Sequence, residues 1–180
     1  MQRVDPILRR WPVFALVASA AMLAIAHAFE TFGHMVPCTL CLRQREVYWA
    51  AMAIAAAGVG LSFSPWRRQH TTRIAGLALT VTFLYGAYLA AYHAGAEWHF
   101  WPGPTTCSGG GKVSAAALTA LLHGAKSTPP ACDKAAWVFL GVSMAGWNFV
   151  ISVKLAVWSA LSAFPTRRDA VSLTPAARTA

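Results

Sequence analysis

Long apolar runs separated by short polar segments dominate the hydrophobic pattern of this 180-residue chain. Four runs are long enough, or nearly long enough, to cross a hydrocarbon core, which takes about 20 residues. They extend approximately from Trp11 to Phe32, Val47 to Phe63, Ile74 to Tyr92 and Val142 to Phe164. Backbone groups inside lipid must be hydrogen-bonded within their own segment, so we expect helices. The pattern predicts an all-α integral membrane protein, in which residues 1–165 form a four-helix transmembrane bundle and 166–180 form a disordered cytoplasmic tail.

Composition and charge agree with a membrane protein and add an orientation. Apolar residues make up 57% of the chain and charged residues only 12%, which excludes an ordinary soluble domain. Arginines gather before the first run (Arg3, Arg9, Arg10), between the second and third (Arg67, Arg68, Arg73) and after the fourth (Arg167, Arg168, Arg178). Short loops rich in arginine stay cytoplasmic, so both termini should lie inside and the other two loops outside. The net charge of +9 therefore indicates topology and contact with anionic lipid, and no nucleic-acid partner is expected.

The N-terminus also resembles a secretory signal peptide. Arg9 and Arg10 precede an apolar run, and Ala26-His27-Ala28 has the small-residue pattern of a cleavage site. The apolar run continues past Ala28 to Phe32, which is long for a signal peptide. We therefore expect the first helix to be retained.

The four cysteines of the chain fall in the two loops that should face outside. Cys38 and Cys41 form a Cys-x-x-Cys pair in the first, and Cys107 and Cys132 lie in the second. Disulfides persist in such compartments. A Cys-x-x-Cys pair closes a short loop and stabilises a fold little, so its spacing favours a redox centre over a structural disulfide. Zinc sites usually add a second such pair or two histidines, which makes metal binding the weaker reading.

The residues around the Cys-x-x-Cys pair favour a thiolate. Pro37 breaks the chain before Cys38, so the second helix should begin within the pair and place Cys41 in its first turn, where the helix dipole favours an anion. Arg45 follows four residues later, on the same helical face. Its guanidinium should lie beside the Cys41 sulfur, although Arg45 could equally serve as an interfacial anchor.

These motifs resemble the disulfide bond formation protein B (DsbB) family. The resemblance rests on Cys38-Thr39-Leu40-Cys41-Leu42-Arg43-Gln44-Arg45, on Tyr92-His93-Ala94-Gly95-Ala96-Glu97, on Cys107 and Cys132, and on Phe139-Leu140-Gly141-Val142-Ser143-Met144-Ala145-Gly146-Trp147-Asn148. It covers roughly residues 10 to 165. It implies an enzyme of the bacterial inner membrane that reoxidises a periplasmic DsbA-type oxidase and passes the electrons to a membrane quinone. Ubiquinone is the expected cofactor, with menaquinone as the alternative.

The resemblance also implies a role for each site residue. The partner's thiolate attacks Cys107 of a Cys107–Cys132 disulfide, and the freed Cys132 attacks Cys38 of a Cys38–Cys41 disulfide. Cys41 then engages the quinone, and Arg45 stabilises the charge that develops. His93 resembles a position near the quinone, where a ring N–H could bind a carbonyl oxygen, although a lone interfacial histidine is more often a packed or solvated residue.

The second outer loop carries features of its own. Ser108–Gly111 and Pro129–Pro130 could act as hinges, and a short interfacial helix is expected to begin at Ser114. Trp98, Phe100 and Trp101 are typical of interface anchors. In the fourth run, Lys154 should face the bundle interior or extend toward the cytoplasm.

Two alternatives to this assignment remain. A relative of vitamin K epoxide reductase would use similar chemistry but usually carries its Cys-x-x-Cys after the loop pair. A non-enzymatic membrane protein could instead bind a soft metal through Cys38 and Cys41, with Cys107 and Cys132 as a structural disulfide.

Overall fold

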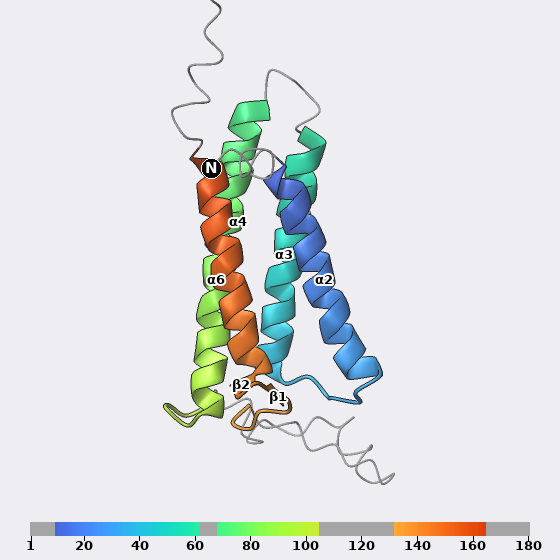
Figure 1. Cartoon of the computed structure of the whole chain (residues 1–180), viewed down its shortest axis with the longest axis vertical. Helices are drawn as coiled ribbons and strands as arrows, with labels where there is room; N and C mark the ends of the chain where they lie inside the picture. The colour runs from blue at the N-terminus through green and yellow to red at the C-terminus, as the bar shows by residue number, and fades with distance from the viewer. Residues whose placement is uncertain (1–9, 62–67, 105–131, 165–180) are drawn as a thin grey trace, which may run out of the picture.

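The computed structural model describes residues 10–61, 68–104 and 132–164 and is almost entirely helical. Its helices are α2 (Trp11–Thr31), α3 (Thr39–Leu61), α4 (Arg68–Glu97) and α6 (Met144–Ala163), and a hairpin of β1 (Val138–Phe139) and β2 (Val142–Ser143) precedes α6. Cys107, the two hinge segments, the short interfacial helix and the C-terminal tail are predictions that lie outside the described residues. The four helices run side by side, so that the start of α2 and the end of α6 lie at one end of the bundle (Figure 1).

The helix boundaries confirm the predicted order and revise two lengths. The second helix begins at Thr39, within the Cys-x-x-Cys segment as expected. The third is longer than its apolar run and extends to Glu97, which places His93 inside α4 rather than at the start of a loop. The last helix begins at Met144, where the Ser143 hydroxyl caps it by accepting a 3.1 Å hydrogen bond from the Gly146 N–H.

Three helices in the described residues are long and apolar enough to cross a membrane by length and composition. They are Trp11–Thr31, His70–Glu97 and Met144–Ala163. The remaining long helix, α3, begins with a charged segment that includes Arg43, Arg45 and Glu46. Those first turns lower its apolar character, and α3 is not among the three helices that meet this criterion. Lys154, expected to face inward or to extend toward the cytoplasm, is exposed on the outer surface of α6.

Small residues let the helices approach closely. A side chain added at Gly76 of α4 would meet the Ser162 Oγ at 2.9 Å and the Ser159 carbonyl oxygen at 3.1 Å, both on α6. Such contacts are typical of helix pairs in membranes, where packing rather than water exclusion drives association. A buried cluster that includes Tyr48, Leu79 and Phe83 fills the centre of the bundle.

The end of the bundle opposite the start of α2 and the end of α6 carries Cys38, Cys41 and Cys132. The connection between α2 and α3 and the β1–β2 hairpin both lie there (Figure 1). In the hairpin, Val138 pairs with Ser143 and Phe139 with Val142. The two turn residues, Leu140 and Gly141, have φ values of 52° and 77°, as a tight turn between twisted strands requires. The hairpin thereby sets the start of α6 beside the N-terminus of α3.

Candidate redox site

Cys38 and Cys41 lie at the N-terminus of α3 as a pair of free thiols. Their sulfur atoms are 2.9 Å apart, whereas a disulfide bond is about 2.05 Å long. The Cys38 carbonyl accepts the first helical hydrogen bond, from the Leu42 N–H at 3.1 Å. The Cys38 sulfur accepts a second bond, from the Cys41 N–H at 3.3 Å. Cys38 is therefore the N-cap residue of α3, and its sulfur takes the place that a capping oxygen usually occupies.

The pKa of the Cys38 thiol is lowered from its ordinary value to about 4. The hydrogen bond from the Cys41 thiol lowers it most; burial opposes this, and His93 and the Cys41 backbone N–H lower it further. The sequence suggested that the helix terminus would stabilise a thiolate on Cys41. In the structure the helix terminus and the hydrogen bonds favour a thiolate on Cys38 instead. The reason is that the first helical residue is Thr39, so Cys38 occupies the N-cap position before it.

His93 reaches the cysteine pair from α4. Its Nε2 lies 3.6 Å from the Cys38 sulfur and 3.7 Å from Oε1 of Glu97, one helical turn further along. The His93 and Glu97 side chains are only 6% and 5% exposed. His93, which the resemblance places near the quinone, lies here beside the cysteine pair, and its nearest reactive neighbour is the Cys38 sulfur. Glu97 belongs to the same group, although sequence reasoning assigned it no role.

Arg45 occupies the site differently from the sequence prediction. Its Nη1 lies 2.6 Å from Oε2 of Glu30, and its Nη2 donates to the Ala26 carbonyl oxygen at 3.2 Å. Both partners belong to α2. Both of these guanidinium contacts therefore go to α2, while the Arg45 side chain still lines the same cavity as Cys41. Sequence reasoning missed Glu30, because no pattern along the chain shows which face of α2 meets α3.

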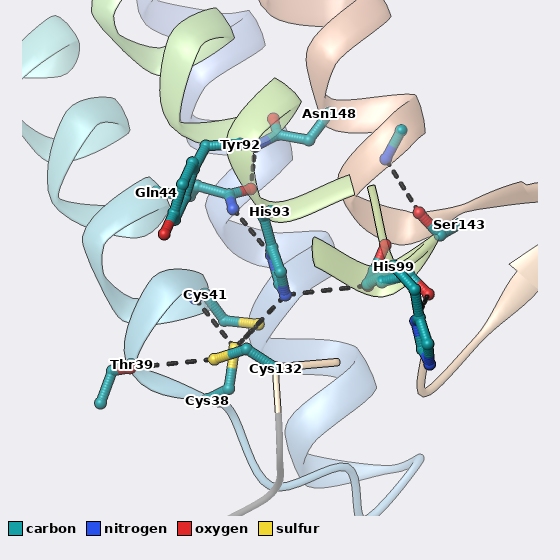
Figure 2. Close-up of polar contacts among 12 residues, drawn as sticks. Cys38, Thr39, Cys41, Gln44, Tyr92, His93, His99, Cys132, Ser143 and Asn148 are labelled. Atoms are coloured by element: carbon teal, nitrogen blue, oxygen red, sulfur yellow. Dashed lines mark hydrogen bonds and ion pairs between the residues drawn. The ribbon is translucent and has the colours of Figure 1, made fainter. Parts of the chain in front are cut away.

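Cys132 comes to the same place from the second loop. It is 2% exposed and packs in a buried cluster with Cys38 and Leu40, against which Cys41 also lies. Figure 2 shows the Cys38, Cys41 and Cys132 side chains together below His93. The Cys132 sulfur is in a disulfide, and Cys107 lies outside the described residues. The fold thus brings one sulfur of the second loop to the Cys-x-x-Cys pair, as the sequence predicted.

Buried polar side chains continue from His93 into the bundle. Gln44, Tyr48, Asn148 and Ser152 form a hydrogen-bonded row that spans α3 and α6. Sequence reasoning missed this row. Its members are polar residues within apolar helices, a signal that marks functional positions in membrane proteins and could have identified Gln44 and Asn148.

A mostly apolar cavity of about 360 Å³ opens beside the cysteines. Its walls come from α2, α3, α6, the hairpin and the outer end of α4. Apolar side chains such as Met22, Phe29 and Ile151 form most of the surface. The polar groups are few and include Arg45 and His93. Pockets of this size and composition are typical of sites for small organic molecules.

The thiols and the imidazole also resemble part of a metal site. The Cys38 and Cys41 sulfurs and a His93 ring nitrogen lie within 4.8 Å of one another. Among the residues that the structure describes, this group has three members, whereas structural zinc sites use four ligands. The grouping is therefore incomplete as a closed metal site.

Comparison with known proteins identifies the family. The family model described as "Disulfide bond formation protein DsbB" matches residues 8–162. Proteins named "Disulfide bond formation protein B" are similar over most of their length: one from Albidiferax ferrireducens is 29% identical over 153 residues, covering 82% of this chain and 83% of the relative. One from Azoarcus sp. (strain BH72) is 29% identical, covering 83% and 91%, and one from Xanthomonas axonopodis pv. citri is 27% identical, covering 88% and 92%. No solved structure matches. The chain, with its dithiol beside an apolar cavity in a bundle of apolar helices, belongs to the DsbB family of membrane proteins for disulfide bond formation.

Proposed function

We propose that this chain is a thiol:quinone oxidoreductase of the bacterial inner membrane that reoxidises a periplasmic DsbA-type oxidase. One observation carries the proposal: the free Cys38–Cys41 dithiol, Cys132 and an apolar cavity meet at one end of the bundle. A protein substrate can reach the second loop, and a lipid-soluble acceptor can reach the cavity. The same end of the bundle would thus hold the sites for the protein substrate and for the lipid-soluble acceptor.

The proposed orientation follows from the arginines. Arg10, Arg68 and Arg73 lie at the end of the bundle remote from Cys38. Arginine-rich ends stay cytoplasmic, so the cysteine end would face the periplasm, where disulfides persist. In this arrangement all four long helices cross the membrane, and α3 places its charged first turns at the outer interface.

Thiol exchange connects the two loops. A partner thiolate attacks Cys107, so that a mixed disulfide forms as the Cys107–Cys132 bond breaks and Cys132 leaves as a thiolate. Cys132 then attacks Cys38, and the Cys132–Cys38 bond forms as the Cys38–Cys41 bond breaks. Each exchange moves one electron pair, and the last one leaves Cys41 reduced at the cavity wall. The packing of Cys132 against Cys38 supports this order.

The cavity residues fit a quinone, with ubiquinone as the favoured form and menaquinone as the alternative. Met22, Phe29 and Ile151 would hold its apolar part, and Arg45 and His93 would bind its polar ring. When bound, a quinone supplies an acceptor for two electrons and two protons. Arg45 stabilises negative charge there, and its bonds to Glu30 and Ala26 keep the guanidinium at the cavity wall.

Quinone absorbance tests the proposal directly. Purified protein in detergent is mixed with a reduced DsbA-type oxidase and a short-chain ubiquinone, and intact protein is compared with Cys41→Ser. We expect quinone reduction that requires both the reduced partner and Cys41. Omitting the partner is the control for direct reduction of quinone by buffer thiols. Folded intact protein that reduces none of several quinones would overturn the proposal.

The second candidate function is metal binding, which the three clustered donor atoms favour. The redox and metal readings differ in the purified protein. Elemental analysis should find zinc and copper far below one ion per chain, and chelators should leave quinone reduction unchanged. A stoichiometric soft metal that Cys38→Ser removes would instead favour the binding protein.

A further inference from the structure

Burying the polar row that starts at His93 lowers the stability of a membrane bundle unless its groups are paired, so we expect the row to have a function. Gln44, His93, Asn148, Tyr48 and Ser152 are all buried. Polar groups in such a place lower stability unless every one finds a partner. Here the row is continuous from the Cys38 sulfur through α4 and α3 to α6, and Figure 2 shows its part from Cys38 to Asn148.

The hydrogen bonds of the row have a direction. The Tyr48 hydroxyl donates to Oδ1 of Asn148, and Nδ2 of Asn148 donates to Oε1 of Gln44. Nε2 of Gln44 then lies 3.0 Å from Nδ1 of His93. An amide nitrogen only donates, so Nδ1 must be the acceptor. A neutral imidazole that accepts at Nδ1 carries its proton on Nε2.

That Nε2–H has two acceptors within reach. The Cys38 sulfur lies at 3.6 Å and Oε1 of Glu97 at 3.7 Å. The other carboxylate oxygen of Glu97, Oε2, is buried and has no hydrogen-bond partner. The imidazole therefore lies between the cysteine pair and a buried carboxylate. The charge on Cys38 determines which of these two groups accepts the hydrogen bond from Nε2–H.

We propose that Gln44 and Asn148 are positioning residues that hold His93 as its Nε2–H tautomer, so that Cys38 carries the negative charge when the pair is reduced. In the reduced pair the Nε2–H donates to the Cys38 thiolate. In the oxidised pair, where that charge is gone, it donates to Glu97. The inference rests on the proposed redox function of the pair, and it assigns a role to side chains that the thiol relay does not use.

The step balances as a two-electron reduction. The Cys132 thiolate attacks Cys38, so that the Cys132–Cys38 bond forms as the Cys38–Cys41 bond breaks, and Cys41 takes up one proton. The Cys107 thiolate, released when the partner leaves oxidised, then attacks Cys132; the Cys107–Cys132 bond forms again, and Cys38 leaves as a thiolate beside the Cys41 thiol. Throughout these exchanges the hydrogen bond from Gln44 keeps Nδ1 of His93 an acceptor, so the donor that faces Cys38 is Nε2–H.

Other charged and titratable groups surround Cys38 and must be counted. Cys41 faces it from α3, and His93 with Glu97 from α4. The cavity that Cys38 lines also contains Glu30, Arg45 and Tyr48, and Lys134 of the second loop. Glu30 and Arg45 neutralise each other at 2.6 Å, whereas Lys134 is exposed. This leaves His93 as the buried donor next to the sulfur.

Alkylation of the reduced protein tests the proposal without any quinone. Iodoacetamide is applied across a range of pH, and peptide mass spectrometry reports Cys38 and Cys41 separately. We expect Cys38 to react more than tenfold faster than Cys41 at pH 6. Gln44→Met keeps the shape of the side chain but removes the amide. It should move the midpoint of the Cys38 alkylation profile about one pH unit upward, which slows the reaction about tenfold at pH values well below that midpoint.

A matched control separates the row from buried hydrogen bonds in general. Ser159 accepts a 2.9 Å hydrogen bond from the Trp11 ring in another part of the bundle, so Ser159→Ala should leave alkylation unchanged. Should Gln44→Met fail to fold, Asn148→Leu and the ¹⁵N spectrum of His93 in the intact protein remain. The spectrum should show a neutral ring with its proton on Nε2, assigned by comparison with His93→Gln.

Three results would overturn the proposal: preferential alkylation of Cys41 in intact protein, the other tautomer at His93, or an unchanged pH profile of Cys38 in folded Gln44→Met. None of these outcomes depends on quinone reduction, so a protein that fails here and still reduces quinone keeps its proposed function.

Discussion

Cys38 caps the helix that contains Cys41. The Cys41 N–H donates to the Cys38 sulfur at 3.3 Å, and the two sulfurs lie 2.9 Å apart. The two cysteines of the pair are therefore not equivalent: one sulfur accepts hydrogen bonds from the backbone and the partner thiol, and the other donates. The two thiols should therefore take up protons differently when the pair is reduced.

The reduction potential of the pair should depend weakly on pH. In the folded, reduced protein the pKa of Cys38 is lowered to about 4. The Cys38 thiolate therefore contributes its full stabilisation to the folded, reduced protein at pH values above the ordinary thiol pKa. This contribution decreases as the pH falls and is lost near pH 4. Between pH 5 and 8 reduction then takes up one proton for two electrons, which gives a slope of about 30 mV per pH unit.

An ordinary dithiol would take up two protons and show about 59 mV per pH unit. Equilibration of the protein with glutathione or dithiothreitol buffers, followed by thiol trapping, measures the slope. In His93→Gln the Cys38 thiolate loses its hydrogen bond from the ring, so the pKa of Cys38 should rise. The slope of the reduction potential against pH should therefore steepen at the acidic end in that variant. A slope near 59 mV down to pH 5 in intact protein contradicts the prediction.

Arg45→Gln should raise the KM for quinone about tenfold and change kcat less. The substitution removes the cation that lines the cavity and leaves Glu30 without its partner, and tenfold corresponds to about 1.4 kcal/mol of binding. Steady-state rates at varied short-chain ubiquinone concentrations measure it. Arg43→Gln is the matched control, because Arg43 pairs with Glu46 on the exposed face of the same helix. Equal effects of the two variants would show that charge near the interface, and not the cavity, matters.

Filling the cavity should block the quinone side alone. Ala26 lines the cavity, whereas Ala24, two positions earlier on α2, is exposed. Ala26→Phe should reduce quinone turnover at least tenfold, while a mixed disulfide with the DsbA-type partner still forms at the normal rate. Ala24→Phe should behave as the intact protein. Normal turnover in Ala26→Phe would place the acceptor elsewhere.

Gly76 and Gly60 should respond in opposite ways to the same change. A methyl group at Gly76 would meet Ser162, Ala163 and the Ser159 backbone within 3.1 Å, so Gly76→Ala should destabilise the bundle by about 1 to 3 kcal/mol. Gly60 has nothing within 4 Å, and Gly60→Ala should add up to about 1 kcal/mol of helix propensity. Unfolding in mixed micelles with increasing denaturing detergent measures both. Similar effects would mean that α4 and α6 are not in such close contact.

Much of this arrangement could be predicted from the chain alone. Apolar runs placed the long helices in their order, and Pro37 together with the Cys-x-x-Cys pair indicated where α3 begins. The resemblance pointed to His93, which the structure places 3.6 Å from the Cys38 sulfur. These predictions depend on local sequence and on spacing, which a single chain reveals directly.

The pairing of side chains between helices could not be predicted. Arg45 meets Glu30 because α2 and α3 are rotated in a particular way, and one apolar run with small residues allows many rotations. The row from Gln44 to Asn148 needs α3 and α6 in one register, which depends on how each of them packs against α4. The helix begins within the pair and has Cys41 in its first turn, as expected, but the chain alone did not show that the Cys38 sulfur would accept the Cys41 N–H and so carry the favoured charge.

The environment of Cys38 comes from segments that are made at different times. The sulfur lies at the start of α3, His93 belongs to α4, and Asn148, which helps to orient that ring, belongs to α6 near the end of the chain. A ribosome therefore finishes the cysteine pair long before it finishes the residues that tune it. Until α6 has packed against the other helices, the chain lacks the oriented ring beside Cys38 and Cys41, so we expect the full reactivity of Cys38 only after complete assembly.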